Sequence, residues 1–244
     1  MKLSKLPILA FVFTILSSFY FGIYQTNRFE DPKILSYTIN PKKTQLNLYW
    51  KNDSGEILGS LNHLKTFVES HNQTLLFAMN GGMYKPSLQP QGLFIQNGKT
   101  ITPLDTNKGN GNFYLEPNGV LYLNHKKESF ICQTKAFKND GNIDFATQSG
   151  PMLILNGKIH AQFKMGSTNT NIRNGVGILP NKNLLFAVSK EKINLYDFAQ
   201  YFKNQGCQNA LYLDGFVSRT YLPEKKWIQL DGNFGVIIGA TMDK

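Results

Sequence analysis

The chain has 244 residues and an excess of positive charge, with 26 Lys and Arg against 16 Asp and Glu and a formal net charge of +10. Aromatic residues make up 13% of the chain, which excludes a long disordered polyelectrolyte. The 21 Gly and 10 Pro follow no fixed period and there are only two Cys, so collagen-like and disulfide-dense folds are excluded too. The length allows one large domain or two small ones with a real core.

The first 24 residues differ in character from the rest. Lys2 and Lys5 precede an apolar run over 6–24. This order is typical of an export signal, and the run is also long enough to cross about 30 Å of hydrocarbon. Bulky aromatic residues at 19–21 leave no clean cleavage site, so we favour an uncleaved signal anchor over a cleaved signal peptide. The sequence predicts an exported protein on the periplasmic or extracellular face, with only this N-terminal segment in the membrane.

A short polar linker over 25–33 leads to a domain over 34–244 in which strand patterns dominate. Asn-Gly dipeptides at 97–98, 118–119 and 156–157 each stand between two apolar runs, which is the pattern of a hairpin turn. Residues 60–70 and 194–205 instead have helical spacing. Ser60 and Asn194 are the expected N-caps of these helices, and Gly206 is placed to end the second. We predict an α+β fold, with a largely antiparallel or mixed β-sheet and at least two packed helices in a single domain.

The two predicted helices and the strands that follow them align without gaps at an offset of 134 residues. The strand ends Met79-Asn80-Gly81 and Leu213-Asp214-Gly215 then coincide. A strand that ends on a short polar residue and a Gly can direct a side chain into a cleft and let a ligand approach closely. Chance and duplication both explain the alignment, and we expect the two strand ends to share a site.

Several kinds of chemistry have no local signature in the chain. The four His residues lack zinc-site spacing, and neither a GxSxG elbow nor an EF-hand loop is present. We therefore assign no residue to a metal, and the question of a carboxylate-bound Ca²⁺ or Mg²⁺ stays open. Basic residues form only doublets, which disfavours nucleic acid as a partner. Cys132 and Cys207 either form a disulfide in an oxidising compartment or are two separate buried thiols.

Four segments combine Gly with polar residues after apolar strands: 80–84, 148–151, 171–177 and 213–218. Gly-rich corners supply backbone N–H groups that can hold an anion, and the guanidinium of Arg173 suits phosphate oxygens. Asp214 follows a short apolar strand, where burial raises a carboxyl pKa and makes the group a candidate general acid or base.

Taken together and in this order, the four segments resemble the motifs of the phosphodiester glycosidase family, and the chain is similar to a bacterial branch of it. The matching motifs are Asn80–Met83, Ser149–Pro151, Arg173 with Gly175 and Gly177, and Leu213–Gly215, and they span most of the predicted exported part. Two departures bear on the substrate. Phe216 and Val217 stand where the family is usually glycine-rich, and Met83 stands where an aromatic residue is usual.

The resemblance implies an extracytoplasmic hydrolase that breaks the bond between an anomeric carbon and a phosphate oxygen in an envelope or extracellular glycan. Asp214 would activate water or stabilise the oxocarbenium-like sugar. The substrate-binding set would comprise Asn80, Gly81, Gly82, Gln148, Ser149, Gly150, Arg173, Gly215 and Ser218. Arg173 and the glycine N–H groups would hold the phosphate, and Asn80, Gln148 and Ser149 would bind the sugar.

No second catalytic carboxylate can be placed from the sequence, because Glu116 and Asp144 are better explained as turn residues. Retention or inversion of the anomeric centre is therefore left open. The alternative to an enzyme is a non-catalytic envelope module that binds phosphorylated or anionic glycans through the same residues.

Overall fold

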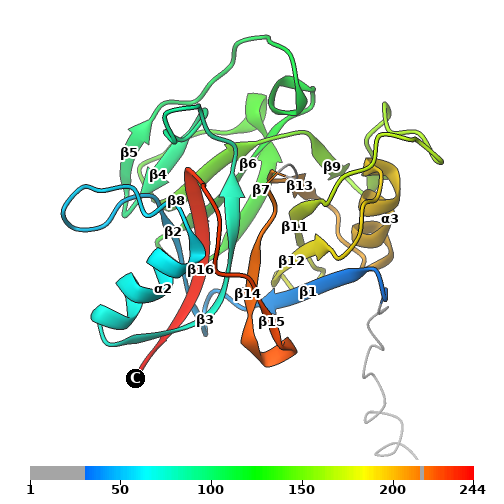
Figure 1. The fold of residues 1–244 in the computed structure, drawn as a ribbon. Coiled ribbons are helices and arrows are strands. Elements are labelled where there is room, and N and C mark those ends of the chain that lie inside the picture. Colours follow the sequence, from blue (N-terminus) through cyan, green and yellow to red (C-terminus); the bar gives the residue numbers. More distant parts are fainter. Residues whose placement is uncertain (1–30, 215–216) are drawn as a thin grey trace, which may run out of the picture. The chain divides into compact units, whose positions relative to one another are not determined.

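A computed structural model describes residues 31–214 and 217–244 (Figure 1). The chain divides into two units, 1–30 and 31–244. The expected signal segment over 1–24 and the site residue Gly215 lie outside the described residues. Within the part that is described, no helix is both long enough and apolar enough to span a membrane.

The strands of the second unit form three sheets, and every described strand pair in them is antiparallel. Sheet A has the order β1 (Ile34–Ile39), β12 (Leu184–Ser189), β11 (Asn174–Ile178), β13 (Ala210–Tyr212), β9 (Met152–Leu155) and β10 (Lys158–Ile159). Sheet B has the order β15 (Trp227–Ile228), β14 (Thr220–Leu222), β3 (Gln73–Gly82), β16 (Val236–Asp243) and β2 (Gln45–Tyr49). Sheet C has the order β5 (Lys99–Thr102), β4 (Phe94–Gln96), β8 (Ile143–Ser149), β6 (Gly119–Asn124) and β7 (Ser129–Gln133).

One hydrophobic core lies between the three sheets, because Phe77 of β3, Phe186 of β12 and Phe94 of β4 belong to the same buried cluster. The helices α2 (Leu61–Ser70) and α3 (Leu195–Asn204) lie on different flanks of the unit (Figure 1). Within residues 31–214 and 217–244 there are also three short 3₁₀ helices: Asn112–Tyr114, Thr134–Ala136 and Pro223–Lys225. The prediction of a largely antiparallel or mixed β-sheet with at least two helices is confirmed, because the described residues form antiparallel sheets and two helices.

Both helices begin and end where their sequences predict. The Ser60 hydroxyl accepts a hydrogen bond from His63 N at 3.2 Å, and the Asn194 side-chain oxygen accepts one from Asp197 N at 2.9 Å. Each bond satisfies a backbone N–H that has no partner within the helix. Gly206 has a φ of 82° just beyond α3, a conformation that glycine adopts without strain. Phe198 and Phe202 of α3 pack into a second buried cluster against sheet A.

Two of the three predicted Asn-Gly hairpins are confirmed. Residues 97–98 join β4 to β5, and residues 156–157 join β9 to β10, with positive φ at both positions of each pair. The prediction of a hairpin turn at 118–119 is wrong. Asn118 donates from its side chain to Phe113 O at 2.9 Å, which holds the preceding segment as a 3₁₀ helix rather than a strand. Gly119 is instead the first residue of β6 and packs closely against Cys132 O.

Candidate active site

Polar residues from the three strands β3, β8 and β11 meet the segment by which the chain passes from sheet A to sheet B. The chain leaves β13 after Tyr212 and enters β14 at Thr220, so Asp214 lies in the connection between the two sheets. Asp214 is partly buried, whereas Ser149 at the end of β8 is fully buried. Strand ends that converge in this way bring side chains together from distant parts of the sequence.

The backbone N–H and C=O groups of both Leu213 and Asp214 are hydrogen bonded. Leu213 N donates to Asn174 O at 3.2 Å, and Leu213 O accepts from the Ser149 hydroxyl at 2.5 Å. Asp214 N donates to the Asn174 side-chain oxygen at 2.8 Å. Asp214 O accepts from the Asn80 side-chain amide at 2.8 Å and from the Ser218 hydroxyl at 3.2 Å. These five bonds fix the position from which the Asp214 carboxylate projects.

Asn80 and Asn174 form the centre of this network and have no solvent exposure. The Asn174 amide donates to Asn80 O and to the Asn80 side-chain oxygen, both at 3.0 Å. The Asn80 side-chain oxygen also accepts from Arg219 N at 3.1 Å. Buried polar groups that are all hydrogen bonded define one arrangement of their surroundings, since each lost bond leaves a costly unpaired group. The asparagine pair therefore links β3, β11 and the 213–219 connection.

Asn174 was not predicted as a site residue, although it stands in one of the four glycine segments. Its neighbour two positions on, Val176, belongs to the core between the sheets. Alternation along a strand places Asn174 on that same inner face, and a polar residue on an apolar face was the signal available in the sequence.

The offset of 134 residues corresponds to a direct contact. Asn80 and Asp214, which coincide in that alignment, are joined by the hydrogen bond from the Asn80 amide to Asp214 O. The two helix–strand units therefore meet at their strand ends.

The glycines of these corners are explained by close packing. A Cβ at Gly81 would lie 2.4 Å from Ile238 Cγ1, and one at Gly82 would lie 2.5 Å from the Thr147 hydroxyl oxygen. A Cβ at Gly150 would lie 2.7 Å from Asn118 Cβ. The absence of a side chain at these three positions lets β3 and β8 approach their neighbours.

Gln148 holds a different segment from the one that Ser149 holds, because alternation places the two side chains on opposite faces of β8. The Gln148 side-chain oxygen accepts from Leu93 N and Asp105 N at 3.0 and 2.9 Å. Its amide donates to Asp105 O at 2.6 Å. Gln148 is fully buried and ties the connection after β5 to sheet C, apart from the bonds around Asp214.

Arg173 precedes Asn174, so its side chain takes the other face of sheet A, where it is 2% exposed. Its guanidinium donates to Ile193 O at 3.2 Å, to the Tyr212 hydroxyl at 3.1 Å and to Asn169 O and Oδ1 at 2.9 and 3.1 Å. Four hydrogen bonds with protein oxygens leave it little capacity for a ligand. Arg173 thus supports the segment around Asn169 and the ring of Tyr212.

Arg219 is a second cation at this site, and it is more accessible than Arg173. Its Nε donates to both carboxylate oxygens of Asp231 at 2.9 and 2.8 Å, and its side chain is 39% exposed. Tyr84 lies within electrostatic reach of the Asp214 carboxylate. Burial raises the pKa of Tyr84, and the negative charge of Asp214 raises this pKa further.

The remaining candidates lie in other surroundings. Val217, which was expected to reshape the pocket, packs against the cluster that contains Leu64 of α2. Glu116 forms an ion pair with Lys135 at 2.6 Å, and Lys135 lowers the pKa of Glu116. Asp144 binds His125 at 2.5 Å near the start of β8, away from the Ser149 end.

The two cysteines are free thiols and belong to different hydrophobic clusters, so the structure shows separate thiols instead of a disulfide. Burial raises the pKa of Cys207 to about 12 and that of Cys132 to about 11. Within residues 31–214 and 217–244, no three His, Cys, Asp or Glu side chains gather as a metal-binding group.

Comparison with known proteins places the chain in a family. The family model described as phosphodiester glycosidase matches residues 73–234. The uncharacterized protein YigE of Escherichia coli (strain K12) is 40% identical over 190 residues, which cover 78% of this chain and 74% of that protein.

Solved structures share the fold at low sequence identity. The zebrafish N-acetylglucosamine-1-phosphodiester alpha-N-acetylglucosaminidase catalytic domain, auto-inhibited by its pro-peptide, matches with a TM-score of 0.59 and 15% identity over 86% of this chain and 84% of that one. A putative exported protein from Burkholderia pseudomallei matches with a TM-score of 0.53 and 10% identity over 85% and 73% of the two chains. On the family match and the identity to YigE, the chain belongs to the phosphodiester glycosidase family.

Proposed function

We propose that the protein hydrolyses a sugar-1-phosphodiester, with Asp214 as the catalytic carboxylate. The observation that carries this proposal is the five hydrogen bonds around Asp214, which come from four separate segments. A reacting group held by buried side chains needs little reorganisation when the reaction begins. The carboxylate would activate water or stabilise positive charge on the sugar ring.

The roles of the polar residues follow from their bonds. Asn80, Asn174 and Ser149 use their polar atoms on the backbone at Leu213 and Asp214, so we assign them as positioning residues. Arg219 is our candidate for the phosphate, because its side chain is exposed beside this network. Arg173 acts from the opposite face of sheet A, where it supports Tyr212.

We further propose that the substrate is an envelope or extracellular glycan met outside the cytoplasm. The support is the basic N-terminus followed by the apolar run over 6–24. A module that binds phosphorylated glycans without cleaving them is the alternative, and it would use the same exposed groups.

The test is turnover of a GlcNAc-1-phosphodiester by the purified full-length chain, measured as released reducing sugar. Asp214→Asn keeps the size of the side chain and removes its charge, so the rate should fall by roughly 10²–10⁴-fold. Asp243→Asn is the matched control, since Asp243 pairs with Gln73 at the far end of β3 from Asn80. Binding of several such diesters without turnover by the wild type would favour the module instead.

A further inference from the structure

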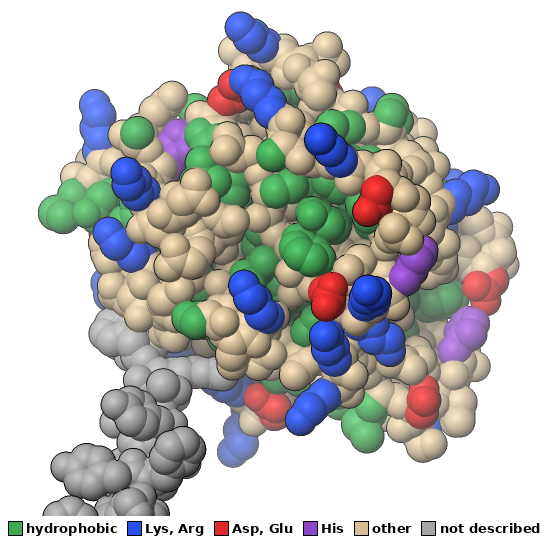
Figure 2. All heavy atoms as spheres, turned by 180° about the vertical axis from the view of Figure 1, so that it is seen from behind, with side chains coloured by type: hydrophobic (Ala, Val, Ile, Leu, Met, Phe, Trp, Pro, Cys, Tyr) green, Lys and Arg blue, Asp and Glu red, His purple; other side chains and the backbone are tan. Residues whose placement is uncertain are grey.

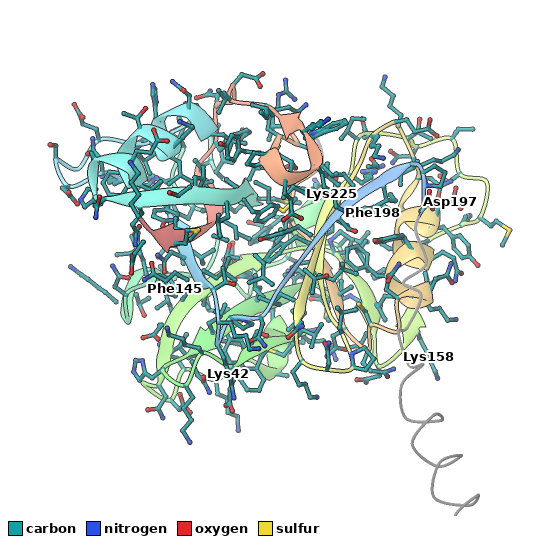
Figure 3. All side chains as sticks on the ribbon, turned by 90° about the horizontal axis from the view of Figure 1, so that it is seen from below. Lys42, Phe145, Lys158, Asp197, Phe198 and Lys225 are labelled. Atoms are coloured by element: carbon teal, nitrogen blue, oxygen red, sulfur yellow. The ribbon has the colours of Figure 1, made fainter. Side chains whose placement is uncertain are left out.

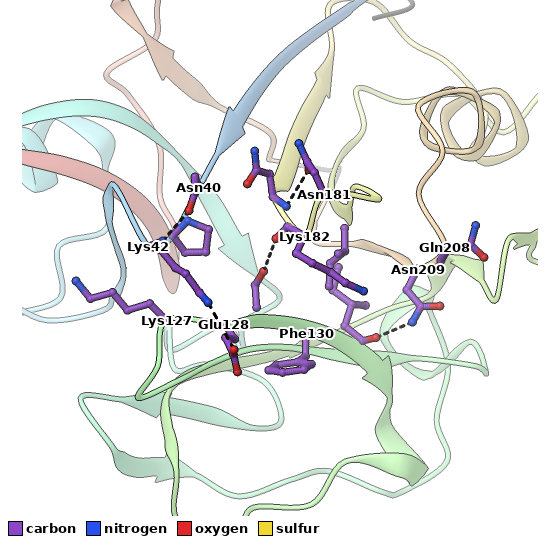
Figure 4. Close-up of a pocket in the computed structure, with 14 residues that line it drawn as sticks. Asn40, Lys42, Lys127, Glu128, Phe130, Asn181, Lys182, Gln208 and Asn209 are labelled. Atoms are coloured by element: carbon purple, nitrogen blue, oxygen red, sulfur yellow. Dashed lines mark hydrogen bonds and ion pairs between the residues drawn. The ribbon is translucent and has the colours of Figure 1, made fainter. Parts of the chain in front are cut away.

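A hollow of about 610 Å³ opens at the end of sheet A that is remote from Asp214 (Figure 4). Its lining includes Ile178 at the end of β11 and Asn209 just before β13. Asn174 and Asp214 occupy the opposite ends of the same two strands. Four residue steps along β11 correspond to about 13 Å, so the hollow is separate from the candidate active site.

The polar side chains of this hollow keep unused hydrogen-bonding groups. Asn40 and Asn181 each accept a backbone N–H at the side-chain oxygen, from Lys42 N and Asn183 N, which leaves their amide nitrogens for a ligand. The side-chain amides of Asn183 and Gln208 have no hydrogen-bond partner among the described residues. Amides that both donate and accept are suited to the hydroxyl groups of a sugar.

Positive charge exceeds negative charge around the hollow. Lys42, Lys127 and Lys182 line it together with one acid, Glu128. Glu128 lies 3.6 Å from the Lys42 ammonium group and accepts from the Asn124 amide at 3.0 Å. The hollow therefore presents a net positive potential to a ligand. Figure 2 shows that basic side chains also outnumber acidic ones over one whole face of the molecule.

Lys182 lines the hollow from an unfavourable backbone conformation. It has a φ of 66° in the turn between β11 and β12, a region in which Gly and Asn are favoured over Lys. Figure 4 shows the Lys182 side chain extending into the hollow. Its ammonium group therefore adds positive charge inside the hollow, and a change to glycine removes this charge without backbone strain.

Phe130 supplies an exposed apolar surface at the same place. It is 38% exposed, and its ring stacks on Tyr122 with centroids 5.0 Å apart and planes 17° apart. Phe130 also borders a second hollow of about 440 Å³ on the other side of β7. A fixed aromatic ring between two hollows offers a platform for a chain of several rings rather than a single small molecule.

We propose that this hollow binds an acidic saccharide chain at a site separate from Asp214. Phe130 contacts the apolar face of a sugar ring, the amides bind its hydroxyl groups, and Lys182 neutralises a carboxylate or phosphate on the chain. The proposal does not depend on hydrolysis, because none of these residues belongs to the network around Asp214.

The test measures binding of a short oligogalacturonate to the full-length chain by calorimetry, with an uncharged galacto-oligosaccharide of equal length and inorganic phosphate as comparison ligands. We expect the acidic oligomer to bind more tightly than either. Lys182→Gly should weaken this binding roughly fivefold, as loss of one favourable charge contact predicts, and Phe130→Ala roughly tenfold. Thermal unfolding should show that Lys182→Gly is as stable as the wild type or more so.

Lys226→Gly is the matched control. Lys226 also has a positive φ, of 57°, but it follows the 3₁₀ helix of sheet B, and its neighbour Lys225 lies far from Lys42 in Figure 3. Its replacement should change binding less than twofold. Equal losses for Lys226→Gly and Lys182→Gly would overturn the proposal, as would equal binding of the neutral oligomer or of phosphate alone, or no binding of any ligand.

Asp214→Asn separates this proposal from the proposed hydrolysis. It should retain full binding of the oligogalacturonate, and loss of binding would place that ligand at the Asp214 end and overturn the second site. If the wild-type protein binds the oligogalacturonate but hydrolyses no phosphodiester, the hydrolase proposal alone would fall.

Discussion

The two ends of β11 and β13 use the same types of residue in opposite ways. At the Asp214 end, Asn80, Asn174 and Ser149 are fully buried and bond to the protein. At the other end, the amides of Asn183 and Gln208 are accessible and have no hydrogen-bond partner in the described structure. Buried amides define the position of a neighbour, whereas accessible amides are available to a ligand.

The contrast shows that burial decides what a polar residue can contribute. An amide with both groups bonded inside the protein stabilises one geometry and acts on chemistry through the group it holds. An amide at the surface contributes little to folding and can exchange water for a ligand. The three predictions that follow test this distinction, from the largest effect to the smallest.

The largest effect on stability is expected for Asn174→Ala. The change removes the acceptor of the Asp214 N bond and one of the two bonds to the Asn80 side-chain oxygen, which keeps its bond from Arg219 N. A buried group that loses its partner costs about 1–3 kcal/mol and each further lost hydrogen bond about 0.5–1.5 kcal/mol, so the free energy of unfolding should fall by about 2–4 kcal/mol. Urea unfolding measures the loss. Asn183→Ala at the hollow is the control and should change stability by less than about 0.5 kcal/mol.

Equal losses in the free energy of unfolding for Asn174→Ala and Asn183→Ala would contradict the distinction between the two ends of β11 and β13. Asn174→Ala is also expected to lower kcat for a phosphodiester more than it raises KM, because it displaces Asp214 without removing a ligand contact.

An intermediate effect is expected from the arginines. Arg173→Lys should reduce stability by about 2 kcal/mol, since a single ammonium cannot replace four bonds to three residues in a buried site. Arg219→Lys should cost less than about 1 kcal/mol, because its ion pair with Asp231 is exposed to solvent. The melting temperatures of the two variants show which substitution costs more stability.

Kinetics distinguish the two arginines further. If Arg219 contacts the phosphate, Arg219→Lys raises KM for a phosphodiester at nearly unchanged stability. A larger KM change for Arg173→Lys at full stability would return the phosphate role to Arg173.

The smallest effect concerns pH. Burial lowers the pKa of His160 below its ordinary value of 6.5, although its bond to Glu116 O opposes the shift. The unfolded chain therefore binds a proton more readily than the native protein, and stability should decline as the pH falls below 6.5. His160→Gln should flatten the dependence of the melting temperature on pH in this range.

His71, the C-cap residue that follows α2, has a pKa shift of the opposite sign. Its hydrogen bond to Phe67 O, followed by that to Asp53, raises the pKa of His71. His71→Gln should remove stability that is present below pH 6.5 and lost at higher pH. The same pH response in both variants would contradict these assignments.

The sequence predicted the elements whose signals are local. The caps Ser60 and Asn194 and two of the three Asn-Gly turns are such signals, because the residues that form them lie within a few positions of each other. The prediction of a hairpin at 118–119 was wrong because the Asn118 side chain bonds to Phe113 O, and Phe113 is itself buried in the fold. No local pattern contains that information.

The motifs of the candidate site were also visible, since Asn80 and Asp214 end similar strands. What could not be predicted is the partner of each polar atom. Ser149 and Asn174 meet Leu213 and Asp214 only because β8 and β13 end where β11 begins. Likewise, the guanidinium of Arg173 looked available for phosphate until the fold brought Tyr212 and Asn169 to it.

The most direct test of the central claim is hydrolysis of a GlcNAc-1-phosphodiester in water enriched in ¹⁸O. A glycosidase whose Asp214 carboxylate acts at the anomeric carbon breaks the carbon–oxygen bond, so the released phosphomonoester should contain no ¹⁸O, and Asp214→Asn should release almost none of it. Incorporation of ¹⁸O into the phosphate would show attack at phosphorus and contradict the assignment.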